Sequence, residues 1–202
     1  MNHWNTRFQD ENYVYGTKPN VFLEEAHSQL QLSGNALSIA EGEGRNAVFL
    51  AEQGMKVTAW DYAEAGLAKT KKLAEEKNVS VRTELVDLND ALWEKNKWDE
   101  LVCIFGHFPS ELRNKTLLSV EEVVKPGGYF LAEVYSKHQI PYESGGPKDL
   151  DFLYGPEEFW ETFRDWRIVH FFMGEVVRNE GKLHNGLSHV IQFVGQKPND
   201  NK

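Results

Sequence analysis

The stretch "LSIAEGEGRNAVFLAEQGMKVTAWD", residues 37–61, contains the pattern that predicts the fold of this chain. It begins with an apolar run of strand length, turns at Gly42 and Gly44, continues as a helix-length segment, and ends in a second apolar run that closes at Asp61. The spacing G-x-G-x-x-A between a strand and a helix, with an acid roughly twenty residues further on, is typical of a ligand-binding turn in an open α/β sheet.

The charges beside this turn distinguish two classes of ligand. Glu41 and Glu43 flank Gly42. A pyrophosphate at the start of the following helix would be repelled by these two acids at short range. S-adenosylmethionine carries a sulfonium and an ammonium cation and has no phosphate, so the same acids would attract it. The spacing allows both a dinucleotide and this methyl donor, and the charge favours the methyl donor.

Along the whole chain, apolar runs of strand length alternate with helix-length amphipathic segments, which predicts a mostly parallel sheet covered by helices. Strands are expected at residues 35–40, 56–61, 79–87, 98–106 and 125–135, helices at 45–54, 63–78, 109–124 and 156–165, and a closing hairpin at 166–181 and 187–198. Residues 138–155 are rich in Gly, Pro and polar side chains and long for a connection, so we predict a functional loop there.

Composition limits the class of protein. With 202 residues, 41% of them hydrophobic, one domain is the default expectation. The single cysteine, Cys103, excludes a disulfide framework and favours a reducing compartment. We find no run of bilayer-spanning length and no signal-peptide pattern, so we expect a cytoplasmic protein. Acidic residues outnumber basic ones 31 to 22 without a basic stripe, so neither nucleic acid nor a membrane is an expected partner.

Two acids end successive strands of the predicted sheet. Asp61 can accept hydrogen bonds from both hydroxyls of a ribose, and Asp87, in "ELVDLND", stands where an adenine amino group could be read. Ligands of open α/β sheets bind outside the carboxyl ends of the strands, so these acids and the glycine turn belong to one predicted site.

Several segments resemble the successive motifs of class I S-adenosylmethionine-dependent methyltransferases. They are "GEGRNAVFLAEQG", "VTAWD", "VDLND" and "VKPGGYFLAEVY". "EGEGRN" together with "YVYGTKPNVFL" is similar to the tellurite-resistance (TehB-like) and thiopurine-type branch. The resemblance implies a Rossmann-like, seven-stranded, mostly parallel sheet with helices on both faces and a reversed last strand. It also implies S-adenosyl-L-methionine as the cofactor.

The resemblance implies roles for particular residues and segments. The cofactor would lie over the turn, with its ribose on Asp61 and its adenine near the end of the third strand. The cofactor-binding residues expected on this basis are Arg7, Tyr15, Ala40, Glu41, Gly42, Glu43, Gly44, Asp61, Tyr62, Asp87, Leu88 and Phe105. Within one methyltransferase domain spanning 1–202, residues 1–30 would form a lid, 36–135 the cofactor-binding core and 136–198 the substrate side.

The chain departs from the family pattern at the start of the turn. Ser38 and Ala40 stand where the family usually has an acid and a glycine. In the family, the acid at the position of Ser38 helps to organise the methionine end of the cofactor. We therefore expect Glu41 or Glu43 to compensate.

One histidine is placed to act on the methyl acceptor. His107 follows the fourth strand, and an imidazole can take a proton near neutral pH. His184, in "KLHNG", is a weaker candidate, and we predict no set of metal ligands. The predicted function is methyl transfer to a small-molecule nucleophile such as a thiol or a chalcogen oxyanion. An NAD(P)-dependent Rossmann oxidoreductase and a non-catalytic S-adenosylmethionine-binding protein stay open, as does the choice between monomer and homodimer.

Overall fold

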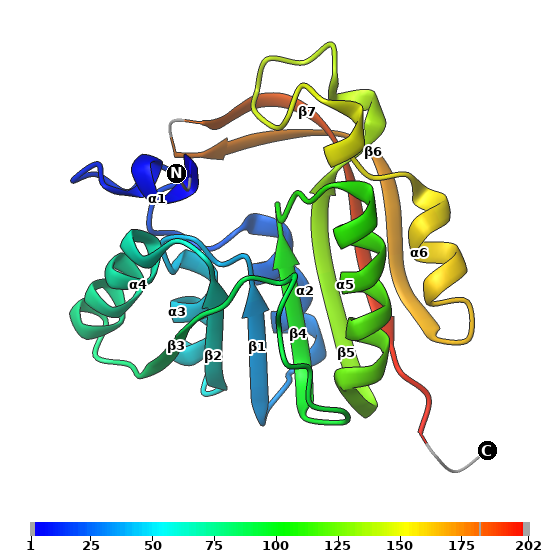
Figure 1. Ribbon diagram of the computed structural model, residues 1–202. Helices are drawn as coiled ribbons and strands as arrows, with labels where there is room; N and C mark the ends of the chain where they lie inside the picture. The colour runs from blue at the N-terminus through cyan, green and yellow to red at the C-terminus, as the bar shows by residue number, and fades with distance from the viewer. Residues whose placement is uncertain (1–2, 182, 200–202) are drawn as a thin grey trace.

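A seven-stranded sheet in the order β3-β2-β1-β4-β5-β7-β6 forms the centre of the computed structural model, which describes residues 3–181 and 183–199 (Figure 1). The strands are β1 (Asn35–Ile39), β2 (Lys56–Asp61), β3 (Val81–Leu85), β4 (Trp98–Ile104), β5 (Val124–Tyr135), β6 (Arg167–Glu180) and β7 (His184–Gln196). β1 to β5 run parallel, and β7 is antiparallel to both of its neighbours. The predicted reversal of the last strand and the closing hairpin are confirmed.

Helices cover both faces of this sheet. They are α1 (His3–Phe8), α2 (Val21–Leu30), α3 (Arg45–Glu52), α4 (Glu64–Glu76), α5 (Ser110–Val123) and α6 (Pro156–Thr162), with single 3-10 turns at Lys137–Gln139 and Leu150–Phe152. Buried side chains place α2, α3 and α4 on one face and α5 and α6 on the other (Figure 1). Each helix in the described part of the chain is too short or too polar to cross a lipid bilayer.

The sequence analysis did not predict α2. Its start carries a recognisable signal, because the side chain of Asn20 accepts a hydrogen bond from the Leu23 amide at 3.0 Å and so caps the helix. Phe22 and Leu23 bury their side chains against the sheet. Ten residues are short for a pattern-based prediction, and burial against the sheet supplies the stability that the isolated segment lacks.

The strand order places the functional end of the sheet. β1 and β4 are neighbours, and the helices that follow them, α3 and α5, lie on opposite faces. The chain therefore separates at the carboxyl ends of β1 and β4, where open α/β sheets bind ligands. The predicted segments 1–30, 36–135 and 136–198 stay a prediction, and their residues 1–2 and 182, like residues 200–202, lie outside the described residues.

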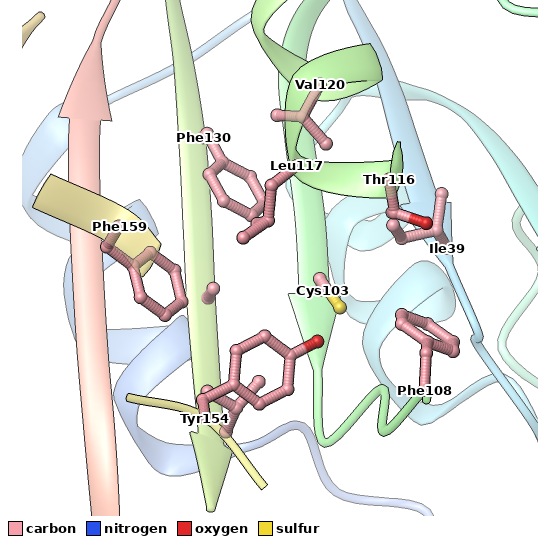
Figure 2. A pocket seen from close by; sticks show the side chains of 11 residues that line it. Ile39, Cys103, Phe108, Thr116, Leu117, Val120, Phe130, Tyr154 and Phe159 are labelled. Carbon is pink, nitrogen blue, oxygen red and sulfur yellow. The ribbon is translucent and has the colours of Figure 1, made fainter. Parts of the chain in front are cut away.

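Cys103 belongs to the core. It lines an internal cavity of about 10 Å³ between β4, β5 and α5, and the Tyr154 hydroxyl points into the same space (Figure 2). This volume suits at most one water molecule. Burial raises the pKa of the Cys103 thiol to about 12, so the thiolate does not form near neutral pH.

We expect Gly44→Ala to destabilise the protein by about 2 to 4 kcal/mol, measured by urea unfolding. Gly44 has φ +96°, and a Cβ added there would lie 2.6 Å from the Thr70 Cα, so the substitution adds overpacking to left-handed strain. Gly54→Ala is the matched control, because φ is +90° but nothing lies within 4 Å of the added atom. It should cost only about 1 to 2 kcal/mol. Equal losses would contradict the close approach of α3 to α4.

Candidate functional site

Two residues with left-handed backbone stand at the point where β1 and β4 separate. Ala40 follows β1 with φ +51°, and Phe105 follows β4 with φ +52°. Residues with a Cβ rarely adopt this conformation, and such strain concentrates at functional sites. A glycine, which the family resemblance led us to expect at the position of Ala40, would adopt this conformation without that cost. The backbone is thus bent at both strand ends that border the candidate site.

The carboxylate of Glu41 covers the start of α3. Its Oε1 accepts hydrogen bonds from the amides of Asn46 at 3.1 Å and Ala47 at 3.0 Å, and Oε2 accepts from the hydroxyl of Ser38. These helix amides are the donors that a pyrophosphate uses in dinucleotide-binding folds. In this chain an acid of the turn already occupies them. The carboxylate also reaches the position of Ser38, where an acid was expected.

Glu41 is buried, and burial raises the pKa of its carboxyl to about 7. The hydrogen bonds from Ala47, Ser38 and Asn46 oppose this shift by stabilising the ionised form. Glu41 is therefore a group of the turn that changes charge near neutral pH.

Asp61 connects β2 to the glycine turn. Its carboxylate accepts from the amides of Gly42 and Ala63, each at 2.8 Å, and burial raises its pKa. Tyr62 beside it is half exposed, and its pKa is raised by burial and then by the charges of Asp61 and Asp87. The predicted ribose and adenine acids, Asp61 and Asp87, therefore both lie near Tyr62.

The two residues predicted near the adenine differ in exposure. Asp87 lies in an exposed turn in which its carboxylate accepts from the Asn89 amide at 2.9 Å. Leu88 is buried among the apolar side chains of the core on the α5 face. Asp87 is thus exposed to solvent after the end of β3, whereas Leu88 next to it is part of the core.

The N-terminal segment lies directly over the glycine turn. A Cβ added at Gly42 would lie 3.2 Å from Cζ of Phe8, so Phe8 packs on the turn. Glu43 accepts from the amides of Val14 at 2.8 Å and Tyr15 at 3.3 Å and forms a 2.7 Å ion pair with Lys69. The side chain of Glu43 therefore holds the N-terminal segment in place.

Arg7 and Tyr15 lie together at the edge of this cover. Arg7 Nη1 donates to the Tyr15 hydroxyl at 3.1 Å, and the guanidinium lies 4.6 Å from the centre of the Trp4 ring. Among the described residues, Arg7 forms no ion pair with a carboxylate. Its positive charge is available to an anionic group of a ligand.

An aromatic cluster, formed by Tyr15, Phe105, His107, Tyr135 and His184, borders the turn on the side of β5 and β7. The Phe105 ring lies 4.6 Å from Tyr135 and 4.3 Å from His184, and Tyr15 lies 4.5 Å from His184, measured between centroids. Tyr135 Oη and His184 Nδ1 are both buried. His184 Nδ1 has no hydrogen-bond partner in the described chain, and the Tyr135 hydroxyl lies near the side chain of Ser188. Burial raises the pKa of Tyr135 and lowers that of His184, so both are neutral near pH 7.

His107 has partners on both ring nitrogens. Nδ1 donates to the Phe152 carbonyl at 2.8 Å, and Nε2 accepts from the Tyr135 amide at 3.4 Å. Burial lowers its pKa to about 4. Both ring nitrogens of His107 are thus engaged and the ring is neutral near pH 7, and the predicted role as a general base stays a prediction.

The sequence analysis did not single out Tyr135 and gave His184 only as a weaker candidate. Tyr135 is the last residue of β5, so the rule that ligands lie at carboxyl strand ends points to it. No comparable local signal marks His184, because its contacts with Tyr15 and Phe105 join residues far apart in the sequence.

A larger open cleft, of about 530 Å³, lies at the opposite end of the sheet and is lined in part by Lys56, Arg82 and Lys97. None of the predicted site residues lines it. The predicted site residues instead gather around the carboxyl ends of β1, β2 and β4.

Comparison with known proteins connects this geometry to a family. Residues 8–191 match the model of the family described as "Tellurite resistance protein TehB". The chain is 28% identical over 151 residues to a probable S-adenosyl-L-methionine-dependent methyltransferase TehB of Haemophilus influenzae, covering 73% of this chain and 49% of that protein. The chain thus spans about half the length of the curated relatives that it matches.

Solved structures share the fold. The crystal structure of TehB from Haemophilus influenzae superposes with a TM-score of 0.70 at 23% identity, covering 87% of this chain and 61% of that one. A chain from a study of the conversion of a disulfide bond into a thioacetal group during echinomycin biosynthesis has a TM-score of 0.75 at 12% identity, covering 95% and 87%. The sheet order is that of the class I methyltransferase fold.

The pKa of Glu41 predicts how stability depends on pH. Because the folded-state pKa lies near 7 and the unfolded value near 4.5, the folded state keeps a proton that the unfolded state has lost between these values. The contribution of Glu41 to the free energy of unfolding is therefore largest below about pH 4.5. It falls by about 3 kcal/mol in all as the pH rises to about 7. Glu41→Gln should remove this fall, measured as the difference between the two proteins' unfolding free energies at pH 5 and pH 8. Parallel profiles would contradict the raised pKa.

Proposed function

Because the chain belongs to the TehB family, we propose that it binds S-adenosylmethionine and transfers its methyl group to a small-molecule nucleophile. The observation that carries this proposal is the position of the Glu41 carboxylate on the first amides of α3. A dinucleotide would need those amides for its pyrophosphate, and it would meet a buried acid there instead. An NAD(P)-dependent oxidoreductase would therefore lack free amides for the phosphates of its cofactor. A cationic sulfonium ligand does not need these amides and is compatible with the acid.

The residues around the turn fit this cofactor. Asp61 keeps acceptor capacity beyond its bonds to the turn and would accept the ribose hydroxyls, with Tyr62 and Asp87 toward the adenine. Arg7, which has no carboxylate partner among the described residues, would receive the methionine carboxylate beside Tyr15. Glu41 and the backbone of the turn from Ala40 to Gly44 would form the floor beneath the methionine end.

The aromatic cluster is the proposed site of the methyl acceptor, and in that role we call it the acceptor pocket. Two of its buried polar atoms, Tyr135 Oη and His184 Nδ1, would each make a hydrogen bond to the molecule that accepts the methyl group. Both side chains are neutral, and His107 is held neutral as well, so the pocket has no strong base. A soft nucleophile that is already ionised, such as a thiolate or a chalcogen oxyanion, needs no base and fits this chemistry best.

The chain would then act mainly by alignment. The cofactor supplies an activated methyl group on a sulfonium when it is bound. Water would be excluded by the rings of Tyr15, Phe105 and His107. The nucleophile would be oriented for an in-line approach by Tyr135 and His184. Holding two reactants in this way can contribute roughly 7 to 11 kcal/mol to lowering the barrier.

Calorimetric titration tests the cofactor assignment. We expect binding of S-adenosylmethionine and S-adenosylhomocysteine and none of NAD. Turnover should then be measured against thiols, chalcogen oxyanions and amines. Binding of S-adenosylmethionine without turnover on the whole panel would favour a non-catalytic binding protein, and binding of NAD would favour an oxidoreductase.

Asp61→Asn should weaken S-adenosylhomocysteine binding by about 1.5 to 3 kcal/mol, or roughly 10- to 100-fold, because a charged hydrogen-bond acceptor for the ribose is lost. Asp90→Asn, the same change at an exposed position, is the control and should bind normally. Titration calorimetry measures both. An affinity for Asp61→Asn within twofold of wild type would rule out the ribose contact.

Tyr135→Phe and His184→Gln should each lower kcat/KM by about 10-fold, because each removes a hydrogen bond to the acceptor, while S-adenosylhomocysteine affinity stays within about twofold. His189→Gln is the control on the same strand, since the His189 ring bonds to Ser136 outside the pocket. His107→Gln should leave the shape of the pH-rate profile unchanged. An inflection between about pH 6 and 7 that disappears in His107→Gln would restore the general-base role.

A further inference from the structure

A buried network of charged and polar side chains lies near Tyr135 and His184 of the aromatic cluster. We call it the Glu180 network, and it consists of Asn20, Arg45, Glu133, Arg178 and Glu180. Each of these residues is less than a tenth exposed. Arg45 Nη1 lies 2.6 Å from Glu180 Oε2, Asn20 Nδ2 donates to Glu180 Oε1 at 3.1 Å, and Arg178 Nε donates to Glu133 at 2.9 Å.

The ion pair between Arg45 and Glu180 joins the two halves of the proposed site. Arg45 directly follows Gly44 and is the first residue of α3, so it moves with the cofactor turn. Glu180 is the last residue of β6, at the tip of the hairpin in which His184 begins β7. One hydrogen-bonded ion pair thus connects the cofactor turn to the strand that carries a polar group of the acceptor pocket.

The hairpin tip also packs against the N-terminal cover. A Cβ added at Gly181 would lie 2.5 Å from the backbone carbon of Tyr15, and the Tyr15 ring contacts His184. The amide of Tyr15 donates to Glu43 in the same turn. Cover, cofactor turn and hairpin tip therefore meet in a small volume.

Electrostatics makes this connection sensitive to displacement. A buried charge is costly without a partner, and Glu180 is the only carboxylate paired with Arg45 in the described part of the chain. Glu180 has a second cation nearby, Arg178 Nε at 3.7 Å, and accepts from the amide of Val21 at 3.2 Å. If the turn moved away from the hairpin, Arg45 would lose its paired carboxylate, whereas Glu180 would keep Arg178 as a partner.

We propose that Arg45 and Glu180 are positioning residues that couple occupation of the cofactor turn to the order of the acceptor hairpin. A ligand that immobilises the turn immobilises Arg45, and through Glu180 it holds the hairpin tip and His184 against the pocket. This inference rests on the proposed function, because it takes S-adenosylmethionine or its product as the ligand of the turn. Binding one partner then prepares the site of the other.

Hydrogen exchange of the free and the S-adenosylhomocysteine-bound protein tests the coupling. In wild type, ligand binding should slow exchange both in peptides of the turn and in peptides spanning the end of β6 and the start of β7, the latter by about 10-fold or more. Arg45→Met leaves Glu180 paired with Arg178 and so should fold. It should bind the ligand, protect the turn, and lose hairpin protection to within about twofold of the free protein.

Arg45→Lys restores the positive charge and should recover part of the hairpin protection, which a purely steric role of the arginine would not predict. Glu180→Gln should lose the protection as well. Glu100→Gln is the matched control, because Glu100 is an equally buried carboxylate paired with His27 toward the amino end of β4. It should keep the ligand-dependent protection of the hairpin.

The outcomes separate this inference from the function on which it rests. If wild type does not bind S-adenosylhomocysteine, the proposed function fails. If wild type binds it and protects the turn but not the hairpin, or if Arg45→Met keeps full hairpin protection, the coupling is overturned and the proposed function stands. Where an acceptor has been identified, Arg45→Met should also lower kcat more than it changes the affinity for the cofactor product.

Discussion

The cofactor end of the site depends on the buried carboxylate of Glu41. It caps the first amides of α3, reaches back to Ser38, and so takes the donors that would otherwise hold a phosphate. The left-handed Ala40 lets the chain turn sharply enough to bring this acid inward. The class of ligand is therefore selected by which backbone groups remain available, and this depends on a single side chain.

The other acids near the turn also have structural partners. Asp61 holds the amide of Gly42, and Glu43 holds the amides of Val14 and Tyr15 together with Lys69. Their orientation is thus set before any ligand arrives, and preorganised charges of this kind need little rearrangement during a reaction. The acids hold the cover, the turn and the second strand in one arrangement.

The acceptor side shows the opposite electrostatic character. Tyr135, His184 and His107 are neutral near pH 7 because burial disfavours their charged forms. A pocket of neutral aromatic groups can align a nucleophile and exclude water but cannot readily remove a proton. In the proposed function, the acids of the turn bind the cationic methyl donor, and the neutral groups of the acceptor pocket position an ionised methyl acceptor.

Local sequence patterns determined the strands, the helices α3 to α6, the closing hairpin, the glycine turn and the strand-end position of Asp61, because periodicity and turn residues act over a few neighbouring positions. The same patterns could not show that Glu41 caps α3, that His107 bonds to Phe152, or that Tyr135 lies beside His184. Nor could they pair Arg45 with Glu180 across 135 positions of sequence. Only the packed fold brings such groups within hydrogen-bond distance, and burial then decides which of them stay charged, because desolvation depends on every element that surrounds them.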